Sequence, residues 1–166
     1  MELISSTSVG AGGAATITFS SIPGTYTDLK LVLSARATST TATMTIAFNG
    51  SSASFTNIYL QGSGSAVSAT SSATFIGNAS ISTNTASVFG NTEIYIANYS
   101  NSATKYFGVE SVSENNASAA FQHAVAGLWS NTAAITQITL SLANFAQFST
   151  ASLYGILKGS GGATAS

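Results

Sequence analysis

Cysteine is absent from the 166 residues of this chain, and charged residues make up only 5% of them. Without cysteine there can be no disulfide bond, thiolate metal site or cysteine nucleophile. Globular domains usually carry about 25% charged residues. Here four basic and five acidic side chains give a formal net charge of −1, which offers no basic patch to nucleic acid or to an anionic membrane. We therefore predict neither a nucleic-acid partner nor a membrane partner.

Long apolar runs are also missing. No apolar stretch approaches the ~18 residues of a membrane-spanning helix. The first ten residues, MELISSTSVG, lack the basic and apolar regions of a secretory signal, so we expect no Sec export. Serine, threonine, asparagine and glycine replace the missing charges. Such a surface is hydrated but repels other copies weakly, which suits a subunit of a large assembly or a secreted or surface protein.

Residue types that usually carry catalysis are scarce. His123 and Asp28 are the single histidine and the single aspartate, so a Ser-His-Asp triad would need both, and no G-x-S-x-G elbow is present. A zinc site would need further nitrogen or sulfur ligands, and a calcium site would need acidic clusters such as D-x-D. His123 shares strand parity with Phe121, Val125 and Trp129, so we interpret it as a neutral imidazole on an apolar face. We predict no metal, no cofactor and no enzymatic activity.

A glycan hydrolase is the enzymatic alternative, and it would use Glu93, Glu110 and Glu114 as its candidate carboxylates. Such enzymes need two carboxyl groups across the scissile bond. Glu93 and Glu110 fall in expected strands, and Glu114 falls in the polar turn SENNAS. Exposed strand positions and a polar turn account for all three residues without catalysis.

Alternation of apolar and polar residues is the dominant pattern. Residues 28–36, DLKLVLSAR, place leucines at alternate positions, as a half-buried strand does. Residues 42–48, ATMTIAF, repeat the pattern and lead into Asn49-Gly50, a favoured two-residue hairpin turn. Residues 54–60, SFTNIYL, are then the expected return strand. Further strands are expected at 14–19, 92–98, 105–112, 120–129, 135–143 and 152–158.

This many short strands in one chain predicts an all-β fold, a single antiparallel β-sandwich that is jelly-roll-like. No stretch keeps a helical period. The strands of an outer-membrane barrel also alternate apolar and polar residues, but such a barrel would need an aromatic girdle and strands of about ten residues. We expect one domain over residues 1–166, with an N-terminal arm at about 1–13 and a C-terminal tail at about 159–166.

The last expected strand is apolar on both faces. Residues 153–157 read LYGIL, which suits a strand in the buried middle of a sandwich. Gly155 leaves room there for an aromatic ring or a close backbone approach. The tail that follows, residues 159–166, has too little apolar area to offset its ordering entropy. If it is ordered, we expect it to lie against another chain.

Five aromatic residues are candidates for a binding surface. Each would serve either a subunit interface or stacking on a sugar ring, and packing in the core is the alternative for each, because tyrosine and tryptophan are readily buried when their polar atom has a partner. These residues are Tyr59, Tyr95, Tyr99, Tyr106 and Trp129.

Two segments resemble a recurrent pattern in structural proteins of tailed bacteriophages. Residues 19–29, FSSIPGTYTDL, match F-x-x-I-P-x-x-Y-x-D-L. Residues 129–156 match W-x-x-T-x-A-I-T-x-I-x-L and then F-x-x-x-S-x-x-S-L-Y-G-I, with Ser149-Thr150 where the pattern has Gly-Ser. The matched positions mark strands and turns, so the resemblance transfers no active site. The residues between the two segments match no pattern.

The resemblance implies a virion component with a β-sandwich, assembled in the host cytoplasm. A single domain without a coiled-coil stalk favours a capsid decoration (cement) protein that binds the major capsid protein or other virion proteins. Such a protein is expected to be a homo-oligomer, with a trimer favoured. The alternative is a tail-fibre or tail-adaptor protein whose β-sandwich binds a receptor or carbohydrate, and its partner would be a host glycan.

Overall fold

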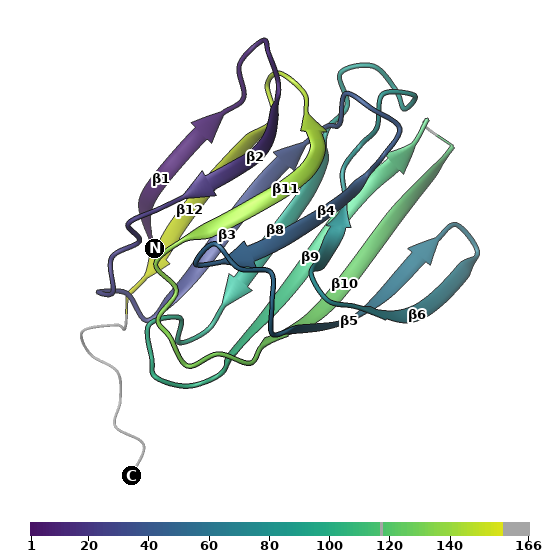
Figure 1. Ribbon diagram of the computed structural model, residues 1–166. Helices are drawn as coiled ribbons and strands as arrows, with labels where there is room; N and C mark the ends of the chain where they lie inside the picture. Colours follow the sequence, from purple (N-terminus) through teal and green to yellow (C-terminus); the bar gives the residue numbers. More distant parts are fainter. Residues whose placement is uncertain (117, 158–166) are drawn as a thin grey trace.

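The computed structural model describes residues 1–116 and 118–157. In these ranges the chain forms two antiparallel β-sheets packed face to face and contains no helix (Figure 1). The strands are β1 (Glu2–Ser8), β2 (Ala14–Phe19), β3 (Asp28–Ala35), β4 (Thr43–Phe48), β5 (Phe55–Ser63), β6 (Ala66–Ser72), β7 (Phe75–Asn78), β8 (Gly90–Ile96), β9 (Lys105–Asn115), β10 (Ala119–Trp129), β11 (Ile138–Phe145) and β12 (Thr150–Ile156).

The strand order confirms the predicted jelly-roll-like sandwich. The larger sheet has the order β1-β12-β3-β8-β9-β10-β5-β6, and the smaller sheet has the order β2-β11-β4-β7. When the β5–β6 and β9–β10 hairpins are set aside and the other eight strands are renumbered along the chain, the two orders become 1-8-3-6 and 2-7-4-5. This is the order of an eight-stranded jelly roll. The two hairpins are insertions that extend one edge of the larger sheet.

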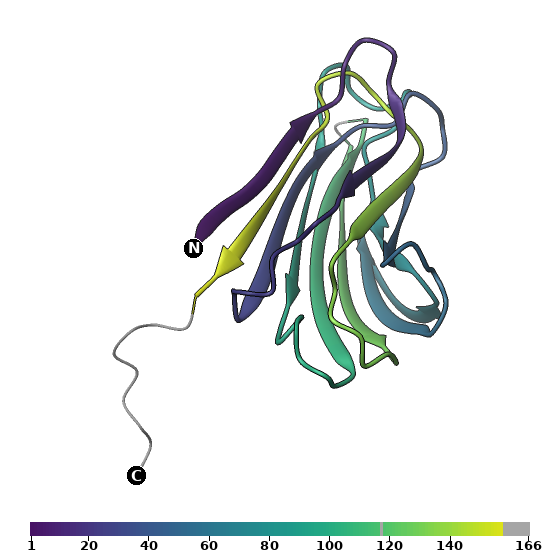
Figure 2. The ribbon, with the colours of Figure 1, turned by 60° about the vertical axis from the view of Figure 1, so that its left-hand side comes forward.

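The smaller sheet covers the central strands of the larger sheet on one face and leaves the other face open. Figure 2 shows the two layers from the side. Alternate residues of each strand fill the space between the layers, as period two requires. Phe48 of β4 lies within an aromatic cluster, with ring centroids 5.1 Å from Phe55, 5.6 Å from Phe107 and 5.3 Å from Trp129. The cluster joins the smaller sheet to both inserted hairpins.

The turn at Asn49-Gly50 forms, but the predicted hairpin is wrong in its pairing. Both residues have positive φ, 51° and 74°, and Phe48 and Ser51 exchange backbone hydrogen bonds of 2.9 and 3.1 Å. The chain then crosses to the larger sheet, where β5 pairs with β10 and β6. The crossing lets Phe55 pack against Phe48 from the opposite layer, and this burial replaces a longer β4–β5 ladder.

The structure differs from the expected N-terminal arm. Residues 2–8 form β1, which pairs with β12 at the edge of the larger sheet. Most of its side chains are exposed, so main-chain hydrogen bonds rather than burial hold this strand. The predicted C-terminal tail, residues 159–166, and its expected contact with another chain lie outside the described residues.

Residues 19–29 and 129–156, the two segments singled out in the sequence, pack against each other. The Ile22 N–H donates to the Thr136 carbonyl over 3.0 Å. The Tyr26 ring lies over Gly155, where an added Cβ would be 2.3 Å from Tyr26 Cγ. This close approach confirms the predicted reason for Gly155. The segments therefore have a structural role, and the strands between them carry the candidate site.

Candidate binding groove

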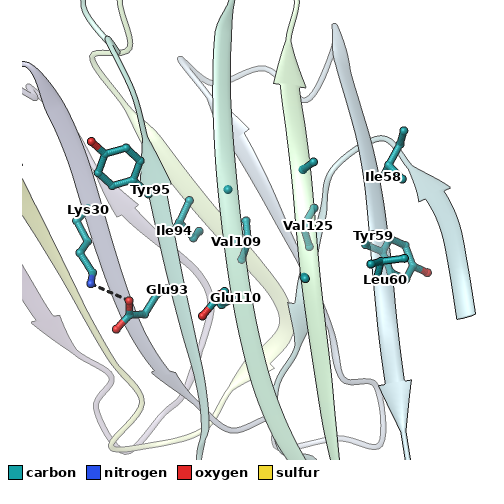
Figure 3. Close-up of a pocket in the computed structure, with 13 residues that line it drawn as sticks. Lys30, Ile58, Tyr59, Leu60, Glu93, Ile94, Tyr95, Val109, Glu110 and Val125 are labelled. Carbon is teal, nitrogen blue, oxygen red and sulfur yellow. Dashed lines mark ion pairs between the residues drawn. The ribbon is translucent and has the colours of Figure 1, made fainter. Parts of the chain in front are cut away.

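The candidate site lies on the face of the larger sheet that points away from the smaller sheet (Figure 3). Each strand there alternates between buried and exposed residues. The pattern is regular along β9, where Phe107 and Val109 point into the core and Gly108 and Glu110 point outward. Outward residues of five neighbouring strands, β3, β8, β9, β10 and β5, line an open groove of about 730 Å³.

The floor of the groove consists of small residues on two neighbouring strands. Gly108 of β9 lies directly opposite Ala126 of β10, and Ala124 is the preceding outward residue of β10. A Cβ atom at Gly108 would meet no other atom within 4 Å. Because β9 and β10 form one of the inserted hairpins, the floor is an addition to the jelly roll.

Larger side chains on the flanking strands form the walls. Ile58 and Leu60 project from β5 beside the two floor alanines and are 59% and 52% exposed. Tyr95 projects from β8 directly opposite Gly108 and is 45% exposed. The groove therefore runs along β9 and β10 between an aliphatic wall and an aromatic wall.

Charged side chains line part of the groove. Glu93 of β8 lies directly opposite Glu110 of β9, and Lys30 Nζ lies 2.7 Å from Glu93 Oε2 (Figure 3). Among the residues that the structure describes, Glu110 has no ion pair. Like charges directly opposite each other are unfavourable. The second carboxylate gives this cluster a formal charge of −1 and makes it attractive to a cationic group.

The Tyr95 ring is held in place by its hydroxyl group. Tyr95 Oη donates to Asp28 Oδ2 over 2.6 Å, and the Asn98 N–H donates to Asp28 Oδ1 over 2.8 Å. The hydrogen bond to Asp28, together with partial burial, raises the pKa of Tyr95, so the phenol stays neutral. Tyr106, two residues before Gly108 on β9, is on the same face and is 67% exposed.

The other three candidate aromatic residues present no ring on the outer face, and two of them are buried. Tyr99 is fully buried, and its hydroxyl donates to the Pro23 carbonyl. Trp129 is 2% exposed within the aromatic cluster. Tyr59 points to the inner face of β5, with its ring centroid 4.4 Å from that of Phe75. Of the five candidates, Tyr95 and Tyr106 present a ring on the outer face.

Glu114 lies apart from Glu93 and Glu110. It accepts hydrogen bonds from the Thr85 backbone N–H over 3.0 Å and from the Thr85 hydroxyl over 3.3 Å, and so holds the chain between β7 and β8. Within the described ranges, no group of three or more histidine, aspartate or glutamate side chains is placed to hold a metal ion.

His123 is buried in the core, as the alternation of β10 predicted. It is fully buried, with ring centroids 5.2 Å from Phe75 and 6.1 Å from Tyr59. Neither ring nitrogen has a hydrogen-bond partner among the described residues. Burial lowers the pKa of His123, which keeps the imidazole neutral.

Sequence reasoning did not find the groove itself. The sequence feature that marks the groove is a set of small outward residues, Gly108, Ala124 and Ala126. In the structure these lie beside the exposed aliphatic residues Ile58 and Leu60. These positions form a site only because β5, β10, β9 and β8 are neighbours, and the order of strands in a sheet does not follow from alternation.

The described residues contain no helix that is long and apolar enough to cross a membrane. Comparisons with known protein families, with curated proteins and with solved structures found no match.

Proposed function

We propose that this protein is a structural subunit of a tailed-bacteriophage virion, a capsid decoration protein that binds the head through the groove. The observation that carries the proposal is the exposed apolar groove on a protein with only 5% charged residues. Contiguous exposed apolar surface bordered by polar residues is typical of interaction sites. The role is one of binding and needs no catalytic step.

The position of the groove in the chain also supports this function. The segments that resemble virion proteins, 19–29 and 129–156, pack together as a scaffold. The floor and the aliphatic wall come from the two inserted hairpins, which lie between those segments in the sequence. Binding sites are commonly grafted onto a shared fold in this way.

The groove suits an extended capsid segment that carries a lysine or arginine beside a small apolar side chain. The Gly108 and Ala126 floor allows a backbone to approach closely. The Ile58 wall supplies apolar contact, and Glu110 supplies a carboxylate without an ion pair among the described residues. A charge-assisted bond to Glu110 would fix the register of the bound segment.

The test is co-sedimentation of the purified protein with heads that lack it. Glu110→Lys reverses the charge, and Ala126→Gln fills the floor while leaving the core untouched. We expect each change to weaken binding at least tenfold, which corresponds to about 1.4 kcal/mol. Thr16→Gln, at an exposed position of β2 in the smaller sheet, is the matched control and should bind normally. Normal binding by both groove variants, or no binding by the unaltered protein, contradicts the proposal.

A second candidate function, a receptor- or carbohydrate-binding tail protein, is favoured by the two exposed tyrosines. The hydrogen bond from Tyr95 to Asp28 holds one ring in place, and a fixed aromatic ring stacks on a sugar at little entropic cost. A glycan array separates the two functions. Binding that is lost in Tyr95→Ala and Tyr106→Ala supports the carbohydrate function, whereas an array without binding removes it.

A further inference from the structure

The outer edge of β6 is a strand edge without protection. β6 pairs with β5 through seven consecutive residue pairs with no irregularity, and no strand in the described part of the chain pairs with its other side. Its sequence, AVSATSS, has no charge and no proline, and six of its seven residues are exposed. A long, regular and uncharged edge is a template for pairing with another chain.

The other edges of the two sheets are protected. β1 begins with Glu2, and its ladder with β12 is irregular between Leu3 and Ser5. β7 has four residues and an irregular ladder with β4. The ladder between β2 and β11 is interrupted. Short strands, charges and bulges are the devices by which edge pairing is avoided, and β6 has none of them.

We propose that two copies of this chain pair through their β6 edges, antiparallel about a two-fold axis at Ala69. This register pairs all seven residues and keeps outward side chains opposite outward side chains. Ala69 then faces Ala69 of the second copy, Val67 faces Ser71, and Ser68 faces Thr70. Every facing pair is small or hydroxylic, and none brings like charges together. The edge is thus complementary to itself, as a two-fold interface requires.

The apolar surface beside the edge favours a second copy as the occupant. On the outer face, Ala69 lies opposite Leu60 and Val67 lies opposite Gly62, and Val67 is 79% exposed. The aliphatic wall of the groove therefore continues to the edge. Pairing joins the apolar surfaces of two copies, and a net charge of −1 on each copy opposes their association only weakly.

The pairing has a consequence for binding. A two-fold axis perpendicular to the sheet places both grooves on the same side of the joined sheet. A dimer would then present two grooves to one surface, which raises avidity without any new contact. This association is distinct from the trimer that the bacteriophage resemblance favoured, and it does not depend on what occupies the groove.

The cysteine-free sequence allows a direct test by crosslinking. Ala69→Cys places one thiol at the proposed axis. Directly opposite residues of antiparallel strands have Cα atoms about 4.5–5.5 Å apart, within the range that a disulfide spans. Ser6→Cys, at an exposed position on the β1 edge, is the matched control. We expect mild oxidation to crosslink the Ala69→Cys protein several-fold faster than the control, and equal rates would overturn the proposal.

Sedimentation equilibrium gives a second readout, independent of crosslinking. The unaltered protein should show a monomer–dimer equilibrium. Ala69→Lys, which changes an exposed side chain, sets two lysines face to face and should weaken the dimer at least tenfold. A protein that is monomeric at every concentration, or a dimer that Ala69→Lys leaves intact, contradicts the pairing. Neither readout involves capsid binding, so failure here is distinguishable from failure of the proposed function.

Discussion

At the scale of single residues, glycine has two different roles: Gly155 lets a ring pack closely in the fold, and Gly108 leaves open space on the floor of the groove. Gly155 makes room for the Tyr26 ring, and an added Cβ would be 2.3 Å from Tyr26 Cγ. We expect Gly155→Ala to lower the free energy of unfolding by about 1–3 kcal/mol, the usual cost of overpacking. Urea unfolding measures this loss. Gly108→Ala is the matched control and should cost nothing, because a Cβ there meets no atom within 4 Å. Equal losses would contradict this role of Gly155.

His123 makes the stability of the fold depend on pH. Burial lowers its pKa in the folded protein, whereas the unfolded chain binds a proton near pH ~6.5. The unfolded state then binds more protons, so stability is full above that value and is lost as pH falls below it. The titratable group that packs against the ring is Tyr59, with ring centroids 6.1 Å apart.

The replacement His123→Leu should flatten this dependence. We expect the unaltered protein to lose stability between pH 6.5 and 5 (roughly the window set by the ordinary histidine pKa), and the variant to lose clearly less. Urea unfolding at both pH values measures the difference. Parallel losses in the two proteins would show that other groups cause the effect.

At the scale of elements, Arg36 holds the segment that connects β7 to β8 through its hydrogen bonds. Residues 79–89, between β7 and β8, contain no strand. The guanidinium donates to the carbonyls of Thr85 over 2.8 Å, Val88 over 2.9 Å and Asn84 over 3.1 Å. The planar fork of arginine matches this set of acceptors, and the single ammonium of lysine does not.

We therefore expect Arg36→Lys to loosen this connection. Backbone amides of residues 82–88 should exchange with solvent at least several-fold faster in hydrogen-exchange measurements. The amides of β9 serve as the internal control and should be unaffected. Unchanged exchange in the connection, or a uniform increase over the whole sheet, would contradict the proposed role of Arg36.

Most strands were predictable, and their partners were not. β1, β6 and β7 were not expected, because β1 and β6 are mostly exposed on both faces and β7 has only four residues. Alternation located the strands at 28–36 and 120–129 because most of their inward side chains are apolar, with His123 as the exception. It wrongly placed β5 beside β4, because Asn49-Gly50 is a strong local turn signal. The packing of Phe55 on Phe48, which draws β5 into the other sheet, is a contact between layers that alternation does not reveal. The groove was missed for the same reason: its floor and walls meet only through strand order. Tyr95 and Tyr106 were among five aromatic candidates, and the sequence did not separate them from Tyr59, Tyr99 and Trp129, whose rings do not lie on the outer face.

At the scale of the whole molecule, a common jelly roll carries two inserted hairpins, and both proposed contacts involve them. The groove uses the outward faces of β9, β10 and β5 together with those of the neighbouring β8 and β3, and the self-pairing edge is β6. The low charge of the chain fits this arrangement, because it leaves both surfaces free to associate. The remaining strands form the scaffold in which segments 19–29 and 129–156 meet.

The copy number of this chain in purified virions, with its position found by labelled antibody, tests the central claim most directly. A decoration protein follows the symmetry of the head and should be present in on the order of hundreds of copies over its surface. Absence of the chain from virions, or only a few copies at the tail, would contradict a role in capsid decoration.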